Sequence, residues 1–218
     1  MKIILTSCNF GDKQSLVINN QDEIDRLNID VKIYNDLNTP SRLLSMHPRL
    51  KGKIPKMLEW LSSPGYDYYI WVDSKFTLNN GIIETLINQL GDADLGLFKH
   101  SHRDSIKSEL EFVNLLIEQG NHYLNSRYVG EHMDKQVADY LSDETFVDDK
   151  LFAAGCFIYR SKLVESREYN ILKEWFFHNN LYSIQDQLSL PYLLHKFKTK
   201  YITFDFDLLN TELMNYNN

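Results

Sequence analysis

The stretch YYIWVDSKFTL, residues 68 to 78, ends an apolar run on an acid and places a lysine two residues later. The carboxylate of Asp73 could bind a divalent cation, and the ammonium group of Lys75 could neutralise a phosphate as a point charge. Ser74 adds a hydroxyl between them. An aspartate that only caps the turn after a buried strand is the alternative interpretation. The spacing therefore indicates a candidate phosphate site in which a lysine takes the place of a second metal-binding acid.

A second group of charges is the basic run HPRLKGKIPK, residues 47 to 56. Four cations fall within eight residues of a chain that is otherwise acidic, namely Arg49, Lys51, Lys53 and Lys56. Fixed positive charge is what a departing phosphate group needs. A solvated basic face of a helix is the alternative.

Further acids and histidines fall at the ends of other apolar runs. His100 and His102 beside Asp104 could ligate a metal, but no further clustered ligand supports this, and Asp104 or Ser105 more simply caps a helix. The literal DxD pairs are placed less well. Asp92 and Asp94 precede their strand, and Asp205 and Asp207 follow the last strand, close to the end of the sequence, where a flexible tail is the alternative.

Alternating strands and helices must position these side chains. Hydrophobic periodicity predicts strands at residues 2–7, 30–36, 66–73, 93–100, 152–160 and 201–206, and helices at 13–27, 53–63, 81–90, 104–119, 131–141 and 162–177. This alternation predicts an α/β/α sandwich with a mostly parallel, Rossmann-like central sheet. Ligands of such sheets bind at the carboxyl ends of the strands. We expect a single domain over residues 1–218, in which the polar segment 120–150 is an insertion over the active face.

Composition, apolar runs and cysteine spacing narrow the possible partners and the location of the chain. The net charge of −7 disfavours a nucleic-acid partner, which requires clustered Lys and Arg. The first residues lack a signal h-region, and no apolar run of about 18 residues follows, so we expect a cytoplasmic chain without a transmembrane segment. Cys8 and Cys156 have no metal-site spacing and are expected to be buried reduced thiols. The oligomeric state is not predictable.

Four motifs resemble a family of glycosyltransferase-like proteins with a GT-A-like fold, found in bacteria and in plant cell-wall enzymes and formerly a domain of unknown function. They are HPRLKGKIPK, YDYYIWVDSKF, HSHRDSIKSE and SIQDQLSLPY, which occur in the family's order between residues 45 and 197. The chain departs from the pattern at Gln185, where the family usually has arginine, and at Lys107, where it has tyrosine.

The resemblance implies a glycosyltransferase, hexosyl or pentosyl, that moves a sugar from a nucleotide sugar, with a UDP-sugar first, to a hydroxyl of a saccharide in polysaccharide biosynthesis. Mn²⁺ or Mg²⁺ is a possible cofactor, with Asp73 as its ligand, although Lys75 would reduce the dependence on metal. The residues implied to bind the donor are Thr6, Phe10, Gly11, Arg49, Lys53, Lys56, Asp73, Ser74 and Lys75. Those implied to contact the donor sugar or the acceptor are His100, Arg103, Glu109, Gly155 and Gln187.

Asp186 in SIQDQLSLPY is the candidate catalytic residue. In an inverting enzyme it would be the general base for the acceptor hydroxyl, and in a retaining enzyme it would bind hydroxyls of the donor sugar. A nucleotidyltransferase is a rival class, but NFGDK after the first strand is not a glycine-rich phosphate loop. A non-catalytic carbohydrate- or protein-binding domain would also explain the 13 Tyr and 12 Phe.

Overall fold

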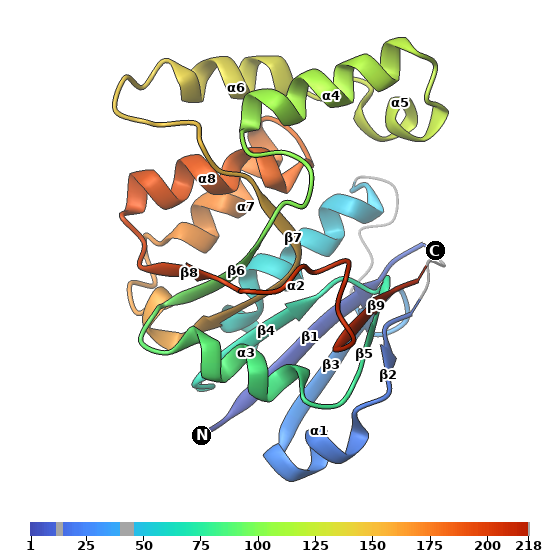
Figure 1. The fold of residues 1–218 in the computed structure, drawn as a ribbon, viewed down its shortest axis with the longest axis vertical. Helices are drawn as coiled ribbons and strands as arrows, with labels where there is room; N and C mark the ends of the chain where they lie inside the picture. Colours follow the sequence, from blue (N-terminus) through green and yellow to red (C-terminus); the bar gives the residue numbers. More distant parts are fainter. Residues whose placement is uncertain (12–14, 40–45, 218) are drawn as a thin grey trace.

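The computed structural model describes residues 1–11, 15–39 and 46–217. Within these residues a six-stranded sheet with the order β3-β1-β4-β7-β6-β8 forms the centre of the molecule (Figure 1). Its strands are β1 (Ile3–Asn9), β3 (Ile29–Asn35), β4 (Tyr68–Val72), β6 (Leu95–Lys99), β7 (Phe152–Arg160) and β8 (Tyr201–Thr203). A small second sheet contains β2 (Val17–Ile18), β5 (Phe76–Leu78) and β9 (Met214–Tyr216).

The central sheet is mainly parallel, which confirms the predicted α/β class. One strand departs from this pattern: β7 pairs antiparallel with both β4 and β6. Because β7 runs in the opposite direction, its first residues lie beside the carboxyl end of β4, with Cys156 opposite Val72. Residue Gly155 is thereby brought to the edge of the sheet where ligands are expected.

Two apolar layers cover the central sheet, because successive side chains of a strand point to opposite faces. On β4, Ile70 and Val72 pack with the cluster that contains helix α3, whereas Tyr69 and Trp71 pack with the cluster of α2, α7 and α8. The helices of these two layers are α1 (Gln21–Leu27), α3 (Ile82–Leu90), α2 (Pro48–Ser62), α7 (Ile171–Leu181) and α8 (Asp186–Phe197).

A third cluster joins α4 (Ile106–Glu118), α5 (His122–Tyr128) and α6 (Met133–Leu141) to the start of α8. Figure 1 shows these three helices as a separate layer beyond α8, with α5 at one end of the layer. The buried side chains of Tyr140 and Leu188 contribute to this cluster. None of the described helices combines the length and the apolar character that a membrane span needs.

Three predicted helix starts were wrong. The first helix begins at Gln21 rather than residue 13, since Val17–Ile18 pairs as a strand with β5, while residues 12–14 lie outside the described residues. Helix α2 begins at Pro48 rather than residue 53, because His47 caps it and proline suits the first turn. Helix α7 begins at Ile171 rather than residue 162, because the Asn170 side chain caps its first backbone N–H groups.

Candidate active site

Asp73 lies directly after β4, at the carboxyl edge of the sheet. Its backbone N–H donates to the carbonyl of Gly155 (2.7 Å). Its Oδ1 accepts from the indole N–H of Trp71 (2.7 Å) and from Nζ of Lys56 (3.4 Å). The side chain of Asp73 is 41% exposed, so its carboxylate is held in place and still open to a ligand.

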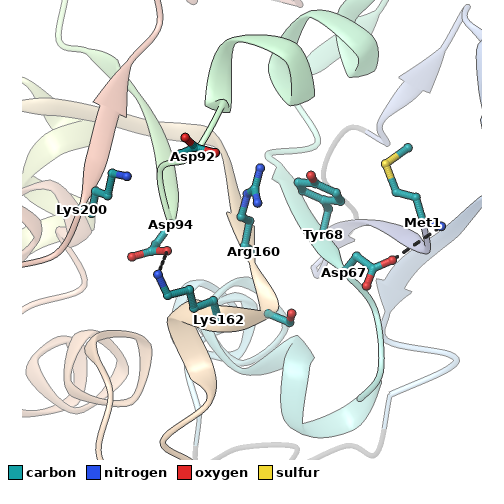
Figure 2. Close-up of a pocket in the computed structure, with 9 residues that line it drawn as sticks. Met1, Asp67, Tyr68, Asp92, Asp94, Arg160, Lys162 and Lys200 are labelled. Carbon is teal, nitrogen blue, oxygen red and sulfur yellow. Dashed lines mark ion pairs between the residues drawn. The ribbon is translucent and has the colours of Figure 1, made fainter.

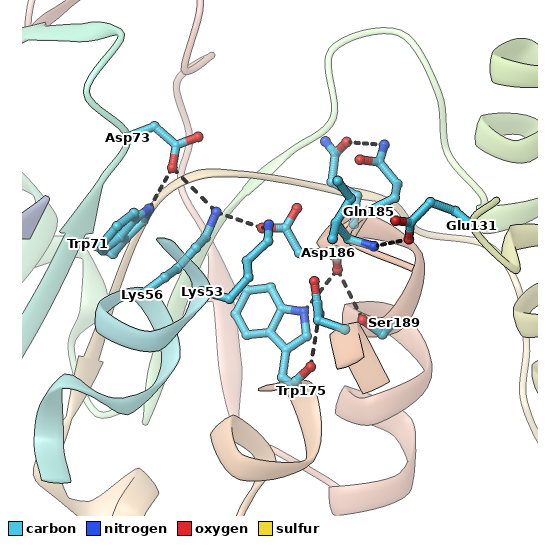
Figure 3. Close-up of polar contacts among 12 residues, drawn as sticks. Lys53, Lys56, Trp71, Asp73, Glu131, Trp175, Gln185, Asp186 and Ser189 are labelled. Atoms are coloured by element: carbon cyan, nitrogen blue, oxygen red, sulfur yellow. Dashed lines mark hydrogen bonds and ion pairs between the residues drawn. The ribbon is translucent and has the colours of Figure 1, made fainter. Parts of the chain in front are cut away.

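The basic run forms the first turns of α2, where residues three and four apart share one face. Lys53 and Lys56 point from this face toward the start of α8 (Figure 3). The Oδ2 atom of Asp186 accepts from Nζ of Lys53 (2.5 Å) and from Nζ of Lys56 (2.7 Å). We call Lys53, Lys56, Asp73 and Asp186 the inner network. It joins residues that are up to 133 positions apart in the sequence.

Most of the inner network is buried, and burial together with the neighbouring opposite charges determines the pKa values of its side chains. Burial alone would raise the pKa of Asp186, but the charges and hydrogen bonds of Lys53 and Lys56 outweigh it and hold that pKa well below its usual range. Burial, partly offset by Asp186, lowers the pKa of Lys53 to about 8. For Lys56, Asp186 and Asp73 outweigh burial and raise the pKa. Asp186 is therefore a carboxylate that binds protons weakly.

A second chain of polar contacts begins beside Asp186. Gln185 donates from Nε2 to Glu109 (2.7 Å) and to Gln187 (3.0 Å), and Glu109 also pairs with Arg103. The guanidinium of Arg103 lies 3.0 Å from Nε2 of His100. The structure thus brings together the four predicted donor-sugar or acceptor residues that come from the third and fourth motifs. Gln185, which replaces the family's arginine, connects them.

Burial, and then the charge of Arg103, lowers the pKa of His100. A hollow of about 750 Å³ adjoins this histidine at the ends of β6 and β8. Its lining includes Lys99, His100, Arg103, Lys150, Phe152 and Tyr201. Its polar and aromatic side chains are of the kinds that bind saccharides.

The predicted nucleotide-base residues lie around the end of β1. Thr6 and Phe10 are buried, and Nζ of Lys51 lies 4.4 Å from the centre of the Phe10 ring. Gly11 has a φ of 72°, which glycine adopts without strain, and its N–H donates to Asp36 (2.7 Å). Asp36 at the end of β3 was not among the predicted residues.

The turn after β4 directs Lys75 toward Tyr216. Ser74 and Lys75 form this turn, so the alternation of the strand no longer applies to them. Lys75 is exposed, and its Nζ donates to the hydroxyl of Tyr216 (3.1 Å). Gly155 packs closely under the site, since a Cβ there would lie 2.9 Å from the Phe76 ring and 3.6 Å from Oδ2 of Asp73.

Helix α5 contributes two side chains that sequence reasoning missed. The Tyr123 ring lies 5.4 Å from the guanidinium carbon of Arg49, and Arg127 donates to the Tyr123 hydroxyl (3.4 Å). The spacing of Tyr123 and Arg127 places both on one face of a helix, but no feature of the sequence shows that this face meets α2.

The side chains around Asp73 are poorly suited to binding a divalent cation tightly. Among the described residues no three His, Cys, Asp or Glu side chains are arranged to hold a metal ion. Mg²⁺ and Mn²⁺ favour several oxygen ligands, whereas Asp73 is the single exposed carboxylate of the inner network and already bonds Trp71 and Lys56.

Of the literal DxD pairs, Asp92 and Asp94 lie away from this site, as expected, whereas Asp207 lies near His100. Asp92 and Asp94 line a hollow at the amino-terminal edge of the sheet (Figure 2), where Asp94 pairs with Lys162 (3.5 Å). Asp205 accepts from Gln89, and Asp207 accepts from Ser101. Cys8 and Cys156 are free thiols whose pKa values burial raises, and Cys8 is half-buried.

A mainly parallel α/β sheet with charged and polar groups gathered at its carboxyl edge defines a domain of the GT-A-like class. The model of the TOD1/MUCI70 glycosyltransferase-like domain matches residues 7–215, and the chain belongs to that family. The predicted family resemblance is therefore confirmed. No protein with curated annotation matches the sequence.

Several solved glycosyltransferases are similar to this chain at low sequence identity. A glycosyltransferase involved in glycosylation of the major capsid of PBCV-1 has 10% identity and a TM-score of 0.50, over 93% of this chain and 81% of that chain. Mouse xyloside xylosyltransferase 1 has 7% identity and a TM-score of 0.47, over 94% and 86%. The galactosyltransferase LgtC, solved with donor and acceptor sugar analogs, has 12% identity and a TM-score of 0.45, over 100% and 87%. The first of these supports the fold alone.

Proposed function

We propose that this chain transfers a glycosyl group from a nucleotide-sugar donor, with a UDP-sugar as the first candidate, to a hydroxyl of a saccharide acceptor. One observation carries the proposal: at the carboxyl edge of the sheet Lys56 pairs with both Asp73 and Asp186, and the three residues come from three different family motifs. Membership of a glycosyltransferase-like family supports the same reading.

In the proposed reaction the bond between the sugar carbon and the diphosphate oxygen breaks, and its electron pair leaves on the diphosphate. The acceptor oxygen forms the new bond to that carbon, and the hydroxyl proton passes to Asp73 or to an oxygen of the departing diphosphate. Fixed positive charge near the diphosphate stabilises the transition state. The hollow beside His100 offers space for the acceptor.

Asp186 is the catalytic residue predicted from the sequence. Of its two predicted roles, its surroundings favour the binding of a donor-sugar hydroxyl over that of a general base. A general base works best with a pKa near the working pH, whereas Lys53 and Lys56 hold the pKa of Asp186 far below that. We therefore propose that Asp186 positions the two lysines and binds a donor-sugar hydroxyl. Its Oδ1 accepts no hydrogen bond from any residue that the structure describes.

The proposal is tested in two stages. A thermal-shift screen against UDP-, GDP-, CMP- and dTDP-sugars, with and without Mn²⁺, identifies the nucleotide and whether the sugar is a hexose or a pentose. Sugar transfer and donor hydrolysis are then compared for the wild type, Asp73→Asn and the matched variant Asp92→Asn at the opposite edge. We expect Asp73→Asn to lower turnover about a hundredfold and Asp92→Asn to leave it unchanged.

Two results would contradict this function. A protein that binds saccharides but neither binds nor turns over any nucleotide sugar would be a carbohydrate-binding domain. Incorporation of a nucleotide into a sugar phosphate, with release of pyrophosphate, would instead identify a nucleotidyltransferase.

A further inference from the structure

The inner network has no surplus of positive charge for a donor. Two lysines, Lys53 and Lys56, face two carboxylates, Asp73 and Asp186. Buried charges are paired because an unpaired one costs several kcal/mol. A nucleotide diphosphate that bound only here would have to compete with both carboxylates.

Three other cations act on Tyr123: the guanidinium carbon of Arg49 lies 5.4 Å from the centre of its ring, Arg127 donates to its hydroxyl (3.4 Å), and the charge of Lys75 also reaches it. Arg49 comes from the first turn of α2, Lys75 from the turn after β4 and Arg127 from α5. Burial raises the pKa of Tyr123, but the positive charges of Arg127, Lys75 and Arg49 outweigh burial and lower that pKa overall. We call Arg49, Lys75, Arg127 and Tyr123 the cationic rim.

The rim cations lack counter-charges. Among the described residues no carboxylate lies within 4.0 Å of Arg49, Lys75 or Arg127. Burial and then the charge of Arg127 lower the pKa of Arg49, so the two guanidinium groups repel each other. The Nε atom of Arg127 is buried and has no hydrogen-bond partner in the part of the chain that the structure describes. Like charges that lie close together repel one another, and the Nε–H group of Arg127 lacks an acceptor. Both features are typical of a site that is completed by an anion.

Helix α5 also brings the rim next to the segment that carries Asp186. The guanidinium carbon of Arg127 lies 5.0 Å from the centre of the Tyr128 ring, and the Tyr128 hydroxyl donates to Oε1 of Gln185 (2.5 Å). Burial lowers the pKa of Arg127, but Tyr128, Tyr123 and Asp186 outweigh it and raise that pKa overall. An anion held by Arg127 and Arg49 would therefore lie beside the inner network. Tyr123 is 51% exposed and presents its ring and hydroxyl to the same space.

We propose that the cationic rim binds the diphosphate of the nucleotide-sugar donor, so that helix α5 supplies part of the donor site. This inference rests on the proposed function. Three cations match the charge of a nucleoside diphosphate, and they supply the positive charge that a divalent cation supplies elsewhere. The inner network is then left to position the sugar at the edge of the sheet.

The direct test is calorimetric titration with inorganic pyrophosphate, UDP and uridine, all in the presence of EDTA. The proteins are the wild type, Arg127→Gln, Arg49→Gln, Lys75→Gln and the matched control Arg167→Gln, whose side chain is exposed in the segment between β7 and α7. Loss of a charge-assisted contact should weaken pyrophosphate and UDP about tenfold in Arg127→Gln and Arg49→Gln. Lys75→Gln should show a smaller loss, and uridine binding should be equal in all proteins.

Each alternative outcome is informative. Unchanged pyrophosphate affinity in Arg127→Gln and in Lys75→Gln would overturn the inference, and Lys75→Gln guards against misfolding because Lys75 is exposed. Loss of all UDP binding in EDTA would overturn it too. A rise in KM for the acceptor alone would assign the rim to an anionic acceptor. Rim-dependent binding of pyrophosphate without binding of any nucleotide sugar would support the rim and contradict the proposed function.

Discussion

The inner network and the cationic rim lie at the same edge of the sheet, and both are built from charged side chains, but they balance charge differently. In the inner network Lys56 and Asp186 are 4% and 7% exposed, and every cation has a carboxylate. In the rim Tyr123 is half exposed and no described carboxylate lies within 4.0 Å of the cations. Burial explains the pairing in the inner network, since a buried charge needs a partner, whereas the exposed Lys75 of the rim needs none.

The inner network and the cationic rim can therefore perform two different tasks, which are to keep a fixed shape and to attract an anion. A buried and balanced network keeps a fixed shape because each of its members is bonded. It cannot attract an anion strongly, because its own carboxylates cancel its lysines. The half-exposed rim can attract the anion, and the cost of keeping its cations together is released when the anion arrives.

The largest effect expected from this comparison is on stability. Asp186→Asn removes the carboxylate that Lys53 and Lys56 share, leaving two buried cations side by side. We expect the free energy of unfolding to fall by about 3 kcal/mol and turnover to fall at least about tenfold. The affinity for the donor should fall less than turnover, because one contact to a sugar hydroxyl is lost while the diphosphate contacts remain. Urea unfolding and steady-state kinetics measure these changes.

The rim gives the contrast for that measurement. Arg127→Gln should leave the free energy of unfolding within about 0.5 kcal/mol or raise it, since it removes a repulsion. Asp36→Asn is the matched control for Asp186→Asn, because Asp36 pairs with Lys51 but is 53% exposed. Equal destabilisation by Asp186→Asn and Asp36→Asn would show that the inner network is not a buried unit.

A second and smaller effect should follow from moving Asp73. In Gly155→Ala the new methyl group would press on the Phe76 ring and approach Oδ2 of Asp73. Overpacking of this kind costs about 1 to 3 kcal/mol, and turnover should fall as well. In the control Gly96→Ala the methyl group would clash with Phe204, far from Asp73. Equal losses of turnover in folded Gly155→Ala and Gly96→Ala would remove Gly155 from the site.

The sequence was sufficient to predict the parts of the site that depend on local order. An apolar run that ends on Asp73 predicts a buried strand with an acid at its carboxyl end, and the structure has this strand as β4. The 3.6-residue period places Lys53 and Lys56 on one helical face. Their shared partner Asp186 is more than a hundred residues away, and only tertiary packing brings the two segments together.

The positions of Lys75 and Arg127 could not be predicted from the sequence, for two different reasons. Lys75 is two residues after Asp73, which would give both side chains one direction on a continuous strand, but the strand ends at Val72 and the turn redirects Lys75 toward Tyr216. Arg127 lies in a polar segment without a recognisable motif. The packing of α5 with α4 and α8 in the third apolar cluster decides where Arg127 lies.

The smallest effect concerns pH and Lys53, which faces Asp186, Lys56 and Asp73. Its pKa is lowered from 10.5 to about 8, so the folded protein loses this proton at a lower pH than the unfolded chain does. Between these values the unfolded state binds more protons, and the contribution of Lys53 to stability therefore rises with pH. The affinity for pyrophosphate should change in the opposite direction, because the site loses one positive charge.

Comparison of the wild type with Lys53→Met isolates this group, because free pyrophosphate titrates identically in both series and the pKa of Cys8, raised to about 12, lies above the pH range used. Between about pH 7 and pH 9 the wild-type affinity should fall, relative to the variant, by about tenfold at most. Over the same range the free energy of unfolding of the wild type should rise relative to the variant. Parallel changes in affinity and stability would mean that Lys53 does not lose its proton in this range, and that the inner network keeps both of its lysines charged.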